Sequence, residues 1–123
     1  MYHLVNLLRL SPAVSDIEII ALADEEDIQF IYLKAELKDG SFLFVRELSA
    51  ADGSKYSYHW QSRTGKLICR WDNAPHHKKI ATFPHHRHLG QNPKINPSEE
   101  TNLEEVMLII ERKLSPKNFR KKP

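Results

Sequence analysis

The chain has 123 residues, a length that encloses one hydrophobic core but not two. Hydrophobic residues make up 41% and charged residues 28%, which is typical of a globular domain. No apolar run approaches the ~20 residues that span a bilayer, and the N-terminus does not resemble a signal peptide, so we expect no membrane partner and a cytoplasmic location. The single cysteine, Cys69, excludes an internal disulfide and fits a buried core position.

The formal net charge of +2 is unevenly distributed along the chain. Residues 1–60 carry 5 basic and 10 acidic side chains, whereas residues 61–123 carry 13 basic and 6 acidic ones, so the halves have formal charges of −5 and +7. A basic second half predicts a partner with phosphate groups, and a complementary protein surface is the alternative for either half.

The first 71 residues show one helical pattern followed by strand patterns. Residues 2–10 place apolar side chains at helical spacing, and Ser11-Pro12 ends this short helix. From Asp16 the sequence becomes β-branched and alternating, with breaks at acidic or Asp-Gly turns. These breaks separate five predicted strands, at residues 17–23, 29–37, 42–48, 55–61 and 66–71.

The rest of the chain predicts a long loop and a second helix. Residues 72–97 contain four prolines and five histidines without periodicity, which predicts an ordered, irregular loop laid over the sheet. Thr101 and Glu104 fit a capping box, and apolar residues at three- and four-residue spacing continue the helix that begins there. Residues 115–123 form a basic tail that a core does not need.

These elements predict a single α+β domain, residues 1–114. It consists of a five-stranded antiparallel meander sheet with a short N-terminal helix, the long His/Pro-rich loop, and a C-terminal helix packed on one sheet face. The strand at 55–61 alternates so strictly that Tyr58 and Trp60 fall on one face and His59 on the other. If the aromatic face packs into the core, His59 is displayed on the wetter face.

Six of the seven histidines lie between Tyr56 and Gly90, together with both tryptophans. An imidazole with an ordinary pKa of about 6.5 exchanges protons near neutral pH, which suits acid-base catalysis on a phosphodiester. Nearby cations would stabilise developing phosphate charge, and exposed aromatic rings would stack on unpaired bases. The candidate catalytic residues are His59, His76, His77, His85, His86, His88 and Asp72, the last to orient a histidine. The candidate substrate-binding residues are Arg70, Arg87, Lys78, Tyr58 and Trp60.

Two other interpretations of the histidines stay open. His86 and His88 could converge on a metal ion with His59 or His76 as a third ligand, although no familiar zinc motif is present. Alternatively, the histidines hold the long loop in place by hydrogen bonding to backbone groups that have no strand partner. The acid-base interpretation needs neither a metal nor another cofactor.

Four sequence elements carry a resemblance to a known family: YSYHWQ, GKLICRWDNAPHH, FPHHRH and PSEETNLEEVMLII. They lie within a stretch from about Asp39 to Glu111 that is similar to the TumE family of prokaryotic toxins. The resemblance implies a small toxin that arrests growth and is held inactive by a cognate helix-turn-helix antitoxin. It does not supply a mechanism.

We therefore predict a cytoplasmic toxin that binds RNA and cleaves it without a metal. His59 would pair with one other histidine of the cluster as base and acid, and Arg70 and Arg87 would clamp the phosphate. The alternatives are a non-catalytic nucleic-acid- or protein-binding module and a metal-dependent hydrolase, and formation of a homodimer is left open. The catalytic hypothesis requires the histidines after Asp72 to lie close to His59 and Arg70.

Overall fold

The computed structural model of the protein describes residues 2–75, 80–90 and 95–115. Along the chain its elements are α1 (Tyr2–Leu10), β1 (Val14–Asp24), β2 (Ile28–Leu37), β3 (Phe42–Ala50), β4 (Gly53–Gln61), β5 (Leu67–Asp72), β6 (His86–Leu89), β7 (Ile95–Pro97) and α2 (Leu103–Leu114). Of the predicted basic tail, only Ser115 lies within the described residues. Neither helix in these ranges is long and apolar enough to cross a membrane.

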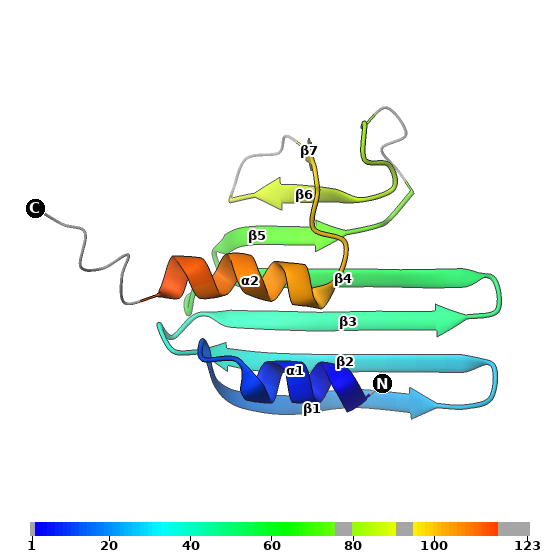
Figure 1. Ribbon diagram of the computed structural model, residues 1–123, viewed down its shortest axis with the longest axis horizontal. Coiled ribbons are helices and arrows are strands. Elements are labelled where there is room, and N and C mark those ends of the chain that lie inside the picture. The colour runs from blue at the N-terminus through cyan, green and yellow to red at the C-terminus, as the bar shows by residue number, and fades with distance from the viewer. Residues whose placement is uncertain (1, 76–79, 91–94, 116–123) are drawn as a thin grey trace, which may run out of the picture.

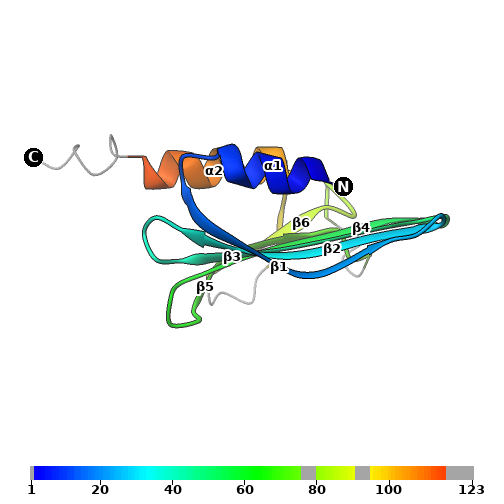
Figure 2. The same ribbon diagram turned by 90° about the horizontal axis from the view of Figure 1, so that it is seen from below.

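The strands form one antiparallel sheet in which each strand pairs with the next along the chain, in the order β1 to β7 (Figure 1). The prediction of an α+β antiparallel meander with a helix at each end is confirmed, but the sheet has seven strands rather than five. Figure 2 shows that α1 and α2 both lie on the same side of the sheet. We call this side the helix face and the opposite side the open face.

Alternating apolar side chains cover the helix face. In β2, Ile31, Leu33, Ala35 and Leu37 are each at most 2% exposed. The apolar stripes of both helices pack in the same core through Leu4, Val5, Leu8, Leu103, Val106, Met107 and Ile110. Full burial of a large apolar side chain contributes about 1.5–3 kcal/mol, so this stripe-on-sheet packing holds the helices in place. Cys69 belongs to this core, and burial raises the pKa of its thiol to about 11.

Helix α2 begins one residue later than the capping box predicted. Its N-cap is Asn102, whose side-chain oxygen accepts a hydrogen bond from the N–H of Glu105 at 2.9 Å. The Glu105 carboxylate accepts from the N–H of Thr101, also at 2.9 Å. Asparagine is at least as good an N-cap as threonine, so the cap lies one residue further along the chain. Glu105 bonds the N–H of the residue before the N-cap, in place of the N-cap N–H of a standard capping box.

The prediction of an irregular loop over residues 72–97 is wrong in part, because β6 and β7 lie within it and extend the sheet. β6 pairs with β5 and β7 pairs with β6. These strands are only 4 and 3 residues long, too short to show a recognisable alternation. Their addition matters for the candidate site because β6 carries His86 and His88 into the sheet.

Candidate functional site

The pairing of β4, β5 and β6 aligns three functional side chains across the open face. His59 lies directly opposite Arg70, and Arg70 lies directly opposite His88. Neighbouring strands are about 4.8 Å apart, so the backbones at the two histidines are separated by about 10 Å with the arginine between them. We call this alignment the open-face row. It brings a histidine of β6 toward His59 and Arg70, as the catalytic hypothesis requires.

His59 is held as a neutral imidazole by its surroundings. Its pKa lies below the usual 6.5, first because the ring is partly buried and second because Arg70 places a positive charge beside it. A hydrogen bond with Gln61 opposes these effects in part. The Nη1 atom of Arg70 lies 3.3 Å from the Nδ1 atom of His59. A guanidinium only donates hydrogen bonds, so Nδ1 accepts this one through its lone pair.

A surface hollow of about 310 Å³ surrounds His59 on the open face. Its walls come from β2 to β5 and consist of Tyr32, Phe44, Arg46, Ser57, His59, Gln61 and Arg70. The guanidinium of Arg46 lies over the Tyr32 ring, 4.4 Å from its centroid. Sequence reasoning missed Arg46 and Tyr32, although Phe44 and Arg46 alternate in β3 and the register places them beside His59 and Ser57. The hollow thus offers two guanidinium groups beside a neutral imidazole.

Asp72 connects the open-face row to a second, more buried group of side chains. Its Oδ2 atom lies 3.3 Å from the Nε atom of Arg70 and 3.7 Å from the Nε2 atom of His88. Its Oδ1 atom lies 2.8 Å from the Nε2 atom of His86 and accepts the N–H of Ala74 at 3.0 Å. The carboxylate therefore fixes the guanidinium of Arg70 in place while it contacts both histidines of β6.

His86 supports Asp72 rather than facing a substrate. It is 2% exposed, and its Nδ1 atom lies 3.0 Å from the carbonyl oxygen of Pro84 while Nε2 contacts the carboxylate. Both ring nitrogens thus already contact oxygen atoms. This burial disfavours the predicted role of His86 as a catalytic acid or base, and its contacts are those of a positioning residue for Asp72.

Two other predicted site residues of this segment lie on the helix face. The Nδ1 atom of His85 is 2.8 Å from the hydroxyl of Tyr56, and the two rings stack with centroids 5.7 Å apart. Arg87 pairs with Glu100 at 3.4 Å, a carboxylate that also accepts the indole N–H of Trp71. The register puts Arg87 and Arg70 on opposite faces of the sheet, an arrangement that disfavours the predicted clamp of both arginines on one phosphate.

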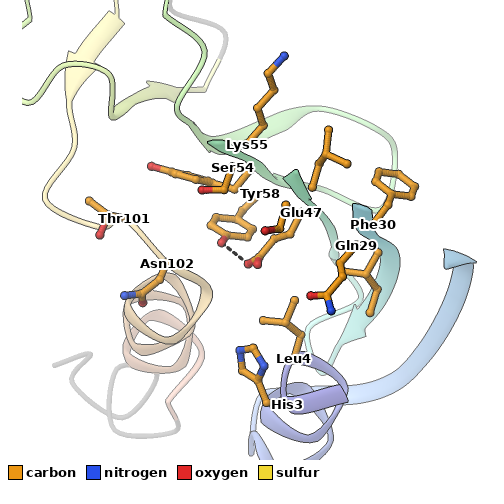
Figure 3. A pocket seen from close by; sticks show the side chains of 14 residues that line it. His3, Leu4, Gln29, Phe30, Glu47, Ser54, Lys55, Tyr58, Thr101 and Asn102 are labelled. Atoms are coloured by element: carbon orange, nitrogen blue, oxygen red, sulfur yellow. Dashed lines mark hydrogen bonds between the residues drawn. The ribbon is translucent and has the colours of Figure 1, made fainter. Parts of the chain in front are cut away.

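Tyr58 and Trp60 lie in the core, 1% and 3% exposed, so neither offers a ring face to a nucleotide base. Tyr58 lines a second cavity of about 230 Å³ between the helices and the sheet, where its hydroxyl donates to Glu47 at 2.5 Å (Figure 3). Burial is the main cause of the raised pKa of this hydroxyl, and its hydrogen bond to Glu47 is the second cause. The Trp60 indole N–H donates to Ser41 at 2.9 Å. Their substrate-binding role therefore stays a prediction, which this burial disfavours.

The remaining predicted residues, His76, His77 and Lys78, lie outside the described residues. Within the described ranges, the structure brings together His59, Arg70, Asp72, His86 and His88 on one face and places His85, Arg87, Tyr58 and Trp60 on the other.

A family model described as Toxin TumE matches residues 4–114, which is nearly the whole chain. No curated protein and no solved structure matches the chain significantly.

Proposed function

Because the chain belongs to the TumE family of toxins, we propose that it is a toxin that cleaves RNA at the open face of its sheet. In this proposal the protein acts in the cytoplasm, needs no metal for cleavage, and is neutralised by a cognate helix-turn-helix antitoxin. The family supports the toxin role and an antitoxin partner. Chemistry on RNA is our inference from the residues of the open-face row.

The observation that carries the proposal is the placement of Arg70 between His59 and His88. In RNA, the 2′-hydroxyl attacks the adjacent phosphorus when a base removes its proton, and the 5′-oxygen leaves when an acid protonates it. A neutral His59 serves as the base, and His88 on the far side of the phosphate serves as the acid. The P–O5′ bond breaks as the O2′–P bond forms, which leaves a 2′,3′-cyclic phosphate and a 5′-hydroxyl.

Arg70 has two successive partners in this mechanism. Without substrate it donates to Nδ1 of His59, while its Nε atom is held by Asp72. A bound phosphate would draw the guanidinium away from the imidazole, because a charge-assisted hydrogen bond to phosphate is stronger than one to a neutral ring. The lone pair on Nδ1 then becomes available to the 2′-hydroxyl. Arg70 then stabilises the negative charge that develops on the phosphate oxygens.

The hollow around His59 also suits an unpaired nucleotide. Tyr32 and Phe44 are half-buried aromatic residues in its wall, with ring centroids 6.4 Å apart. Aromatic side chains bind single-stranded RNA by stacking on its bases, and this occurs with little dependence on sequence. In this proposal Tyr32 and Phe44 stack on RNA bases, the role that the sequence analysis assigned to Tyr58 and Trp60.

The proposal is tested by incubating the purified protein with total RNA, with and without EDTA, and sequencing the new 5′ ends. We expect cleavage in both conditions and 5′-hydroxyl products. His59→Gln and His88→Gln should each lower the rate by about 10²–10⁴-fold, which is the usual contribution of a general acid or base. His85→Gln is the matched control, because this histidine contacts Tyr56 on the helix face. Full activity of the His59→Gln variant would contradict the assignment.

A second candidate is an RNA-binding module without catalysis, which the formal charge of +7 on residues 61–123 favours. It predicts binding that weakens steeply with salt and no new RNA ends. The same incubation distinguishes the two candidates, because only the first generates 5′-hydroxyl products.

A further inference from the structure

We propose that Asp72, His86 and His88 form a binding site for one divalent transition-metal ion of the zinc type. The site shares His88 with the open-face row, but binding of the ion is a separate property from RNA cleavage. It requires only the geometry of these three side chains.

The three side chains already converge. One potential ligand atom from each lies within 4.8 Å of the others. The Nε2 atoms of His86 and His88 are 2.8 Å and 3.7 Å from the two carboxylate oxygens of Asp72. Ligand atoms around a tetrahedral zinc ion are about 3.3 Å apart, since each bond is about 2.0–2.1 Å long. The side chain of His88 is 25% exposed, so it has room to adjust by rotation.

The ligand types select the class of ion. Two imidazoles with one carboxylate suit zinc and its neighbours in the first transition series, whereas magnesium and calcium prefer sites built from oxygen atoms alone. The same three-ligand set leaves one position of a tetrahedral ion for water.

The contacts behind the ligands have the form found around bound metals. A metal-binding histidine usually gives the N–H of its other nitrogen to a carbonyl or carboxylate, which fixes the ring and directs the free nitrogen at the ion. The Nδ1 atom of His86 lies 3.0 Å from the Pro84 carbonyl oxygen in this manner, with Nε2 toward Asp72. Asp72 is itself held by the N–H of Ala74. Two of the three ligands are thus positioned before an ion arrives.

The backbone gives the site rigidity. Asp72 and His86 are directly paired residues of β5 and β6, and His88 follows His86 on the same face of β6. Asp72 and His86 are 7% and 2% exposed, so the ion would lie at the end of a buried pair and not on a solvated surface. Sites on paired strands hold their ligands more precisely than sites on loops.

The test is a titration of protein without a histidine tag, using Co²⁺ followed by visible absorption and Zn²⁺ followed by calorimetry. We expect one equivalent of either ion per chain and shifts in the imidazole NMR signals of His86 and His88. His88→Ala should weaken Co²⁺ binding at least tenfold. The matched control is His85→Ala, which removes a neighbouring histidine on the helix face and should bind as the wild type does.

Thermal unfolding of each variant shows whether it is folded. Asp72→Asn is a second ligand variant, which replaces the carboxylate by an amide of similar volume and should also weaken binding of the ion. A His76→Ala/His77→Ala double variant should bind normally. The proposal is overturned if the wild type shows no saturable binding of one equivalent, if His88→Ala binds as tightly as His85→Ala, or if the double variant alone loses the ion. The titration contains no RNA, so its failure is distinct from failure of the proposed function.

Discussion

The Nη1 atom of Arg70 lies 3.3 Å from the Nδ1 atom of His59, and the two residues are directly opposite each other on β5 and β4. The arginine cannot accept a proton, so this contact disfavours the imidazolium form of His59. Partial burial of the ring acts in the same direction and is the larger cause of its lowered pKa.

The lowered pKa predicts the pH dependence of cleavage. A general base works in its deprotonated form, so kcat/KM should rise with pH through the pKa of His59, at a midpoint below 6.5. Arg70→Gln removes the positive charge but not the burial, so it should move the NMR titration midpoint of His59 upward, toward but not fully to the ordinary value. An NMR midpoint at or above 6.5 in the wild type would contradict this account of the base.

The contact between Asp72 and His86 predicts a large effect on stability. The two side chains are almost fully buried and lie 2.8 Å apart. Removing one partner of a buried polar contact usually costs about 1–3 kcal/mol, because the other group is left unsatisfied. Asp72→Ala should therefore lower the free energy of unfolding by about that amount in urea denaturation. Asp52→Ala, at an exposed turn position, should change it by less than about 0.5 kcal/mol.

The fold was predictable wherever an element was long enough to show its period. Strand β2 buries every second residue from Ile31 to Leu37, and α2 buries four residues at helical spacing, as their sequences indicate. β6 and β7 could not be predicted in this way, because strands of 4 and 3 residues contain at most two repeats of the alternation. Their identity as strands depends on pairing with β5, which is a tertiary interaction.

The site was predictable by residue type but not by grouping. His59 and Arg70 were expected to cooperate, and the register places them together. The division of Arg87 from His86 and His88 follows from the alternation of β6, which was hidden once that segment was taken as a loop. Arg46 was missed for a different reason: its strand was predicted, but only the register of β3 against β4 brings it beside the hollow.

Arg46 provides a prediction that tests the hollow as the RNA-binding surface. Its guanidinium lies over the Tyr32 ring in the wall of the hollow. In the proposed complex with RNA, it would contact a phosphate next to the one that is cleaved. Arg46→Ala should raise KM for a short single-stranded RNA about tenfold and reduce the salt dependence of binding by about one phosphate contact. Arg9→Ala, an exposed change on α1, should alter neither quantity. Equal effects of the two changes would show that the RNA lies elsewhere.

The proposed metal site and the proposed acid share His88, and this overlap predicts that zinc inhibits cleavage. An imidazole whose Nε2 atom binds a metal cannot donate a proton from that nitrogen, so occupancy of the site removes the general acid. Micromolar to millimolar Zn²⁺ added to an RNA cleavage assay should lower the rate as the site fills, and EDTA should restore it. The inhibition should follow the same concentration dependence as the Zn²⁺ binding measured by calorimetry, and His85→Ala should not alter it. If EDTA instead abolished cleavage by the purified protein and zinc restored it, the ion would have a direct part in catalysis, and the metal-dependent hydrolase would replace the acid-base mechanism.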